Sequence, residues 1–598
     1  MVRVSGGGIE RQPVSLVCGV YLLKPGARPP VEWVRHLRNS LNRGTSGSVT
    51  EFEDERIFLA KLDLGAFDAP GWLCGERDVT AVSGDCILGQ VPMPRGRADD
   101  LQVLGETDVA ALRPLLRGAR GYFNLVRYDR SDHRLALATD RIGARSLYVY
   151  RDSEFLVFSG AMRLIESLPG LRLTVNLQGV LETASFGNPL STRTRYKEVT
   201  YFLGGSQLLA ADGHVSTERY WKFDRDACTE ITQDFDDTLD ELYETFRTAV
   251  RLRAGRRTAV FSALSGGLDS RAVTAELWRQ SLDVHSLNVS WKDSLDDVLG
   301  SAFAAKLGIE HYHVDRPLQE AGNSLARRLF DLMTEKAALC ADLPSTARQI
   351  WSGNGGSLGM GHTKMTAAAS EKLRAGDVAG AARHFLSSFK FNLSGKLLSG
   401  EISEWAEALP FNSLMAELGQ IECPDPARAL YFFRLDNDQR WLLAFHFEQI
   451  DRVPFEFIEP LFDPEVISVV CRLPMDFCLR HHMYHEWLKR LPPEVASVAW
   501  QVYPGHEPCP IPFPEGAYTQ WQTPHGIHHG RSLWLSLQDA IRHVGSSSRY
   551  RGLLRTDRVI AAQLLRGLGL RDTSHLLKQV DLIGNALERA GGRVDLPL

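Results

Sequence analysis

Residues 260–264 form an apolar run that stops at two glycines, Gly266 and Gly267, and a helical pattern then extends over residues 271–279. A short apolar run of this kind predicts a buried parallel strand, followed here by a tight turn and a helix. Backbone N–H groups at such a turn are free of side-chain bulk, and the helix dipole adds positive potential at the first helical residues. The segment therefore predicts an α/β fold with an anion-binding turn between a strand and a helix.

The polar residues of this turn indicate that a metal ion accompanies the anion. Ser265 and Ser270 supply hydroxyl groups, whereas Asp269 supplies a carboxylate that would repel a bare phosphate. A Mg²⁺ ion between the carboxylate and the phosphates removes this repulsion. The lysine of a Walker A loop is missing, so the turn is not that motif. We expect Asp269 to bind the metal.

Helical and strand patterns alternate around the turn. Residues 236–252 have helical spacing, residues 284–291 have the pattern of a strand, residues 296–307 that of a helix and residues 311–314 that of a short strand. The alternation predicts a parallel sheet covered by helices on both faces, with its ligand site at the carboxyl ends of the strands.

The length of the chain and a change of pattern predict two domains. A chain of 598 residues is too long for one hydrophobic core. Residues 15–223 contain short strands, glycines and turns, unlike the alternating pattern that follows. We expect a first domain at residues 1–225 and a second at residues 226–598.

Composition and charge exclude several classes of protein. A net charge of −5 and a pI near 6.4 argue against a nucleic-acid-binding protein. The sequence has no apolar run of about 18 residues and no signal-peptide pattern, so we expect a cytoplasmic protein without a transmembrane segment. The nine cysteines include no CxxC pair, which favours reduced thiols. Three groups of histidines match no zinc-ligand pattern, and we expect them to be structural: His311/His313, His481/His482/His485 and His525/His528/His529.

The turn and two later segments resemble the asparagine synthetase superfamily. Residues 265–270 match the SGGxDS pyrophosphate loop of ATP pyrophosphatases, residues 352–359 resemble the SGxGGDE segment that closes over the nucleotide, and residues 456–463 resemble ExRxPFLD. The resemblance implies ATP and Mg²⁺ as cofactors. It also implies a set of nucleotide-binding residues: Leu264, Ser265, Gly266, Gly267, Leu268, Asp269, Ser270, Val289, Ser352 and Gly353.

The same resemblance implies four catalytic residues, Asp269, Asn354, Glu448 and Glu456. Glu448 is the carboxylate to test first as a general base, and an exposed helix glutamate is the alternative interpretation. Asn354 stands where asparagine synthetases have a glutamate and β-lactam synthetases a tyrosine. Ser357 replaces an aspartate that shares the magnesium ion in the superfamily.

Four segments of the first domain resemble the N-terminal glutaminase domain of asparagine synthetases, namely residues 121–129, 135–150, 158–160 and 218–221. The resemblance implies an Ntn-hydrolase-like αββα sandwich in front of a parallel-sheet α/β domain of the ATP-pyrophosphatase type. That glutaminase uses an N-terminal cysteine as its nucleophile, but residue 2 is Val2 and Cys18 lies inside the chain. We expect an inactive glutaminase-like domain, with removal of a propeptide before Cys18 as the alternative.

Residues 500–510 contain no lysine, although the superfamily usually has one in this region that stabilises the acyl-adenylate. The segment resembles the cyclases that close lasso peptides, and its surroundings contain four aromatic residues that could contact a peptide: Trp500, Tyr503, Tyr518 and Trp521. The resemblance implies an AMP-forming carbon–nitrogen ligase that joins an Asp or Glu side chain of a precursor peptide to the peptide's α-amine. It implies a leader peptidase and a leader-binding protein as partners.

Three other functions are consistent with these residues. The chain could be an intramolecular amide synthetase for a small molecule, as in β-lactam formation. It could be a glutamine-dependent synthetase activated by propeptide removal. Asn354 and Ser357 could also mark a decayed active site that only binds a nucleotide or a peptide.

Overall fold

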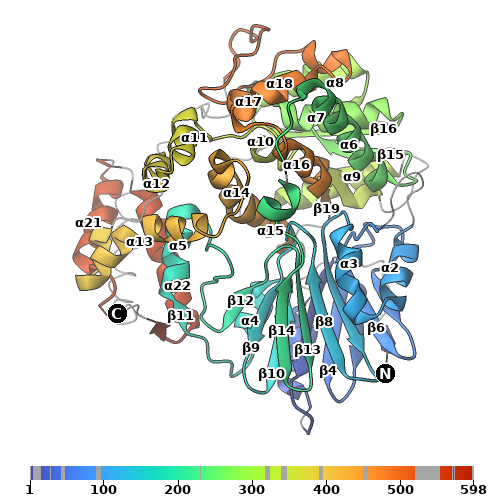
Figure 1. Cartoon of the computed structure of the whole chain (residues 1–598), viewed down its shortest axis with the longest axis vertical. Helices are drawn as coiled ribbons and strands as arrows, with labels where there is room; N and C mark the ends of the chain where they lie inside the picture. The colour runs from blue at the N-terminus through green and yellow to red at the C-terminus, as the bar shows by residue number, and fades with distance from the viewer. Residues whose placement is uncertain are drawn as a thin grey trace.

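The computed structural model places two antiparallel sheets at one end of the molecule and a parallel α/β unit at the other (Figure 1). The structure describes residues 2–4, 15–26, 28–41, 48–88, 96–228, 230–316, 324–338, 346–388, 395–448, 455–518, 552–568, 570–571 and 573–595.

Two antiparallel sheets form the N-terminal part of the chain. The first has the order β1 (Val2–Val4), β3 (Ser48–Glu53), β4 (Ile57–Asp63), β2 (Leu16–Leu22), β10 (Phe155–Ser159), β9 (Tyr148–Arg151) and β12 (Val199–Tyr201). The second has the order β14 (His214–Arg219), β13 (Ser206–Ala211), β8 (Arg134–Thr139), β7 (Phe123–Asp129), β6 (Asp78–Gly84) and β5 (Trp72–Cys74).

The alternation of side chains along β2 shows how the sheets pack. Val17 and Tyr21 belong to the core between the two sheets, whereas Cys18 and Val20 belong to a different core on the other face of the strand. Helices cover the outer faces: α1 (Val31–Ser40) and α4 (Met162–Glu166) with the first sheet, and α2 (Arg97–Glu106) and α3 (Leu112–Arg117) with the second, while α5 (Leu177–Phe186) packs against β11 (Val175–Asn176) and later helices. The expected glutaminase-type αββα sandwich is confirmed.

The second part of the chain is built on a parallel sheet, as the alternating pattern predicted. Its order is β17 (Glu310–Asp315), β16 (Asp283–Ser290), β15 (Ala259–Ala263), β18 (Gln349–Trp351) and β19 (Glu456–Ile458). Its helices include α6 (Phe235–Ala254), α7 (Leu268–Arg279), α8 (Leu295–Leu307) and α9 (Ser324–Ala337). The chain first adds strands on one side of β15 and then on the other, so the strand order reverses between β15 and β18. Ligands of open α/β sheets bind at such a point.

Further helices follow β18, and the end of the chain returns to the N-terminal part (Figure 1). The strand β20 (Val594–Asp595) pairs in parallel with β11 (Val175–Asn176). The other α-helices of the described residues are α10 (Gly356–Gly359), α11 (Ala367–Arg374), α12 (Val378–Ser387), α13 (Gly400–Leu418), α14 (Ala429–Arg434), α15 (Arg440–Glu448), α16 (Pro464–Cys471), α17 (Met475–Cys478), α18 (His482–Leu488), α21 (Thr556–Gly567) and α22 (Ser574–Arg589).

Buried ion pairs join the two parts of the chain. Asp463, at the start of α16, is fully buried and lies 2.7 Å from both Arg120 and Arg253. Arg145 pairs with Glu456 on β19. These contacts fix the sandwich against β19, the edge strand of the parallel sheet, and the segment that follows it.

Among the helices of the described ranges, none is long and apolar enough to cross a membrane.

Candidate active site

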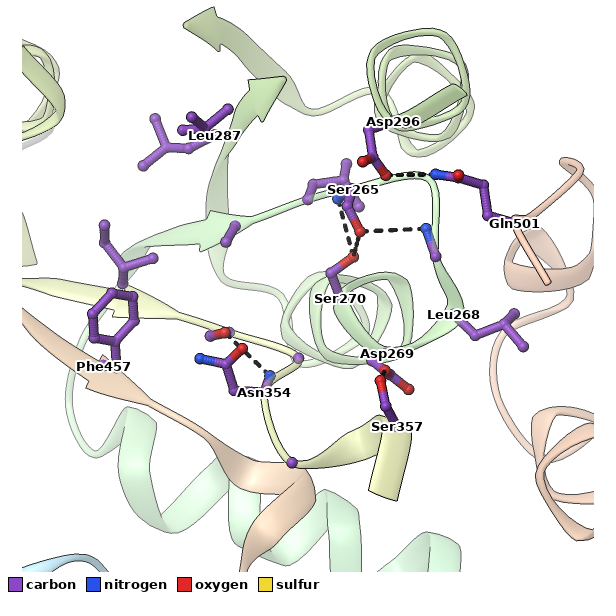
Figure 2. A pocket seen from close by; sticks show the side chains of 18 of the residues that line it. Ser265, Leu268, Asp269, Ser270, Leu287, Asp296, Asn354, Ser357, Phe457 and Gln501 are labelled. Atoms are coloured by element: carbon purple, nitrogen blue, oxygen red, sulfur yellow. Dashed lines mark hydrogen bonds between the residues drawn. The ribbon is translucent and has the colours of Figure 1, made fainter. Parts of the chain in front are cut away.

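The turn between β15 and α7 is held together by its own hydroxyl groups (Figure 2). The backbone N–H of Ser265 donates to Oγ of Ser270 at 3.0 Å, and the N–H of Gly267 donates to Oγ of Ser265 at 3.3 Å. The backbone N–H of Gly266 donates to Oδ1 of Asp296 at 3.0 Å. The turn is therefore preorganised at the N-terminus of a 12-residue helix, the position that favours anions.

A second glycine-rich segment packs directly on this turn. A Cβ atom on Gly353 would lie 2.4 Å from the backbone nitrogen of Ser270, and one on Gly356 would lie 2.6 Å from Cγ of Asp269. Such distances are impossible for a side chain, so glycine is required where residues 352–359 meet the loop.

Asp269 faces the cavity between the two segments. It accepts hydrogen bonds from the hydroxyls of Ser357, at 2.7 Å, and Tyr484, at 2.8 Å. Desolvation raises the pKa of this carboxyl, and the two hydroxyl donors oppose the shift. A buried carboxylate with only neutral partners is well placed to receive a cation.

The residues around Asp269 fit a magnesium ion that is shared with phosphates. Among the described residues no group of three or more His, Cys, Asp or Glu side chains could hold a metal ion alone. Mg²⁺ usually binds through one or two carboxylates together with substrate phosphates. The single carboxylate of Asp269 meets that requirement, whereas a metal site independent of a nucleotide is not supported.

A cavity of about 520 Å³ extends from this carboxylate and has two chemically different ends. The polar end is lined by Ser265, Asp269, Ser270, Asp296, Ser357, His481, Tyr484, Gln501 and Tyr503. The apolar end is lined by Leu287, Val289, Leu325, Leu329, Ile350, Leu442, Phe455 and Phe457. Figure 2 shows Leu287 and Phe457 on the side away from Ser357 and Gln501.

Most of the residues predicted for nucleotide binding line this cavity. They are Leu264, Ser265, Gly267, Leu268, Asp269, Ser270, Val289, Ser352 and Gly353, together with the predicted catalytic residue Asn354. Gly266 is not a lining residue, because its backbone faces Asp296. The residues predicted from the sequence thus include residues from β15, β16 and β18 that lie together at one edge of the sheet.

The two glutamates predicted to be catalytic do not line the cavity. Glu448 accepts hydrogen bonds from the hydroxyl of Tyr148 and from the backbone N–H of Met162, both at 3.1 Å in the first domain. Glu456 is fully buried and paired with Arg145. Their catalytic roles remain predictions, and their contacts are with the sandwich.

A third glutamate, which sequence reasoning missed, lies beside the cavity. Nδ2 of Asn354 donates to Oε1 of Glu459 at 3.0 Å. Burial raises the pKa of Glu459 to about 7, and its Oε2 has no hydrogen-bond partner among the described residues. A carboxyl with such a pKa is suited to accept a proton near neutrality. The sequence feature that could have indicated Glu459 is its position in the segment 456–463, directly after the end of a strand.

The segment that follows α18 supplies part of the polar end. Tyr503 lines the cavity and shares a hydrogen bond of 3.1 Å with the hydroxyl of Ser357. Trp500 is buried, and the hydroxyl of Tyr518 donates to the backbone carbonyl of Lys292 at 2.9 Å. Trp521 lies outside the described residues, as does the group His525, His528 and His529.

The first domain offers no activated thiol at the predicted position. Cys18 is completely buried in β2, and burial raises the pKa of its thiol to about 12.

Two stretches of the chain match the models of known protein families. Residues 107–221 match the family model of the glutamine amidotransferase domain, and residues 241–339 match that of asparagine synthase. The glutamine-hydrolysing asparagine synthetase 3 of Bacillus subtilis (strain 168) is 24% identical over 180 residues, which are 30% of this chain and 29% of that protein. The chain thus matches less than a third of the length of this relative.

Two solved structures are similar to parts of this chain, with low TM-scores. The glutamine phosphoribosylpyrophosphate amidotransferase of B. subtilis is 10% identical, with a TM-score of 0.23, and the match covers 52% of this chain and 70% of that one. The NH3-dependent NAD synthetase of Campylobacter jejuni is 17% identical, with a TM-score of 0.17. The match covers 35% of this chain and 97% of that one. The glutamine amidotransferase match precedes the asparagine synthase match along the chain.

Proposed function

We propose that this asparagine synthetase-like chain is an AMP-forming carbon–nitrogen ligase that closes a lasso peptide. It would activate an Asp or Glu side chain of a precursor peptide with ATP and join it to the α-amine of the same peptide. The products are a macrolactam, AMP and pyrophosphate.

One observation carries the proposal: the turn with Asp269 faces the segment with Asn354 across a single cavity, at the reversal point of the parallel sheet. The loop N–H groups and the helix N-terminus suit the phosphates of ATP. Mg²⁺ held by Asp269 and the phosphates would offset negative charge during adenylation. Leu264, Leu287 and Val289 offer apolar contacts for the adenine ring.

In the second step the peptide amine attacks the carbonyl carbon of the acyl-adenylate. A C–N bond forms, the C–O bond to AMP breaks, and the ammonium proton must be removed. Asn354, which lines the cavity, holds Glu459 beside it, and the second carboxyl oxygen of Glu459, which has no partner among the described residues, can accept that proton. Both reacting groups belong to one folded peptide, which supplies proximity.

The lining of the cavity favours a peptide over a free amino acid. No lysine or arginine occurs among the described residues that line it. A free aspartate would bring a second carboxylate without a cationic partner, which is costly in a desolvated site. Leu329, Leu442 and Phe455 instead suit apolar side chains of a longer substrate. Because Cys18 is buried, it is poorly placed to attack glutamine and release ammonia. This supports a substrate that supplies its own amine.

An intramolecular amide synthetase for a small molecule is the second candidate, because the same adenylation site would serve it. A β-amino acid would then support exchange of pyrophosphate into ATP, and a peptide would not.

The direct test mixes the purified chain with ATP, Mg²⁺ and a leader-free precursor peptide, and follows the peptide by mass spectrometry. We expect the mass of the peptide to fall by one water, and one AMP to be released for each cyclised peptide. A peptide in which the acceptor Asp or Glu is replaced by Asn or Gln is the matched control. Exchange with small β-amino acids alone, or AMP formation that requires glutamine, would contradict the proposal.

A further inference from the structure

The phosphate end of the cavity contains an imidazole that the function above does not yet use. His481 lines the cavity and is 5% exposed. Since no lysine or arginine occurs among the described lining residues, His481 is the one residue of that set able to become a cation. The triphosphate of ATP carries several negative charges, so a donor at this position has a clear potential role.

The backbone holds this ring in place at an energetic cost. Arg480 and His481 both have left-handed backbone angles, with φ of 55° and 66°, between the short helices α17 and α18. Left-handed angles of this kind are unfavourable for residues other than glycine. The backbone N–H of Glu507 donates to the carbonyl of Arg480 at 3.1 Å and fastens this bend to the next segment. Strain of this kind concentrates at functional sites.

Nearby rings support the imidazole but leave a nitrogen without a partner. The ring centroids of His481 and His506 are 4.1 Å apart, and those of His481 and Tyr503 are 5.8 Å apart. Nε2 of His481 is buried with no hydrogen-bond partner among the described residues. It lies against Gly361, where a Cβ atom would come within 2.4 Å of it. Gly361 thus closes off the Nε2 edge of the ring, so the edge with Nδ1 is the one that can meet a ligand in the cavity.

The ring also adjoins the carboxylate that would hold Mg²⁺. Tyr484, three residues further along, donates to Asp269, and Tyr503 is hydrogen-bonded to Ser357, which donates to Asp269. His481 therefore stands one aromatic side chain away from the place where the terminal phosphates would meet the metal.

We propose that His481 binds the terminal phosphates of ATP and the departing pyrophosphate through a ring N–H. This inference rests on the proposed function. In the adenylation step a carboxylate oxygen forms a bond to the α-phosphorus, the bond to the bridging oxygen breaks, and its electron pair leaves with pyrophosphate. The His481 N–H donates to the oxygens that gain this charge. Burial and the neighbouring rings of His506 and His485 lower the pKa of His481 to about 3, so the free site offers a neutral N–H donor.

The test measures binding of magnesium pyrophosphate by calorimetry to the full chain, its His481→Gly variant and a His482→Gln control. Glycine accepts the left-handed backbone, so the variant removes the ring without adding strain. His482 is adjacent but bonds Glu507 and does not line the cavity. A hydrogen bond to a charged group is worth about 1.5–3 kcal/mol, so we expect pyrophosphate to bind about 10- to 100-fold more weakly to His481→Gly. Binding of AMP to His481→Gly should match that of the wild-type chain. Binding of pyrophosphate to His482→Gln should also match that of the wild-type chain.

Two further measurements sharpen the result. Added imidazole should restore pyrophosphate binding to His481→Gly, and Gly361→Ala, which displaces the ring, should weaken it. Unchanged pyrophosphate affinity in a folded His481→Gly variant would overturn the inference, while peptide cyclisation by the wild-type chain could still stand. Conversely, wild-type pyrophosphate binding that depends on His481, without AMP formation from any peptide, would overturn the cyclase proposal and leave this inference intact.

Discussion

Asn354 and Glu459, which are far apart in the sequence, meet at a hydrogen bond of 3.0 Å beside the cavity. The amide of Asn354 lines the cavity, while the carboxyl of Glu459 is fully buried behind it. Under the proposed function we expect Glu459 to take the proton of an amine that attacks near Asn354.

The first prediction is that Glu459→Gln slows cyclisation by about 100-fold, the usual order for loss of a general base. Because the base must be ionised and burial raises its pKa to about 7, wild-type kcat/KM should rise as pH increases through about 7. Glu459→Gln should lose this rise. A pH profile of cyclisation checks both, and an unchanged profile in the variant would exclude Glu459 as the base.

The same ionisation affects stability. The folded-state pKa of Glu459, about 7, lies above its ordinary value of 4.5, so its contribution is fully present below about 4.5 and is lost as pH rises through about 7. Glu459→Gln should remove this part of the pH dependence of the unfolding free energy.

The second prediction separates Glu459 from Glu448. Glu448→Gln should lower the melting temperature, because it weakens the contacts of the carboxylate with Tyr148 and Met162. It should leave kcat within about threefold of wild type, since the side chain does not line the cavity. A loss of kcat without a loss of stability would instead assign the base to Glu448.

The third prediction concerns Asp269. Asp269→Ala should abolish AMP formation, with a loss of at least roughly 100-fold, because the carboxylate would no longer hold the metal with the phosphates. Ser357→Ala is the milder comparison, since Tyr484 would still donate to Asp269. The measurement is release of AMP with the peptide substrate, and full turnover of Asp269→Ala would refute the assignment.

Local patterns in the sequence were sufficient to predict the strand and helices around the turn at residues 265–270. The predicted strand at 260–264 is β15 (Ala259–Ala263), and the predicted helix at 296–307 is α8 (Leu295–Leu307). The helix predicted from residue 271 begins at Leu268, since Gly267 is already its N-cap. Short-range periodicity determines these elements, so errors are confined to their ends.

The members of the site that come from distant segments could not be predicted in this way. Glu456 lies inside β19 and faces Arg145, whereas Glu459 follows the strand and reaches Asn354. Which of the two nearby glutamates contacts a residue that lines the cavity depends on packing against the first domain. His481 depends on a left-handed bend that no local pattern indicates.

The fourth prediction is that the first domain does not hydrolyse glutamine. Since burial raises the thiol pKa of Cys18 to about 12, very little thiolate exists at neutral pH. Cys18→Ala should leave cyclisation unchanged, and iodoacetamide should not label Cys18 in the folded chain. A mature protein that begins at Cys18 and releases ammonia from glutamine would contradict this.

The fifth prediction tests the contact between the two parts of the chain. Burial alone would raise the pKa of Asp463, but the guanidinium groups of Arg120 and Arg253 hold it well below its usual range. The stability from this depressed pKa is present above the ordinary value of 3.8 and is lost as pH falls through the folded-state pKa. Asp463→Asn keeps a side-chain oxygen that can cap α16 but leaves two buried cations without their partner.

We expect Asp463→Asn to lower the free energy of unfolding by about 3–5 kcal/mol, the usual effect of breaking a buried ion pair. Asp557→Asn is the matched control, since its pair with Arg555 is largely exposed and exposed pairs contribute little. Denaturant unfolding of the three proteins at neutral pH measures the difference. Equal stability of Asp463→Asn and wild type would show that the ion pairs are not what holds the sandwich against the parallel sheet.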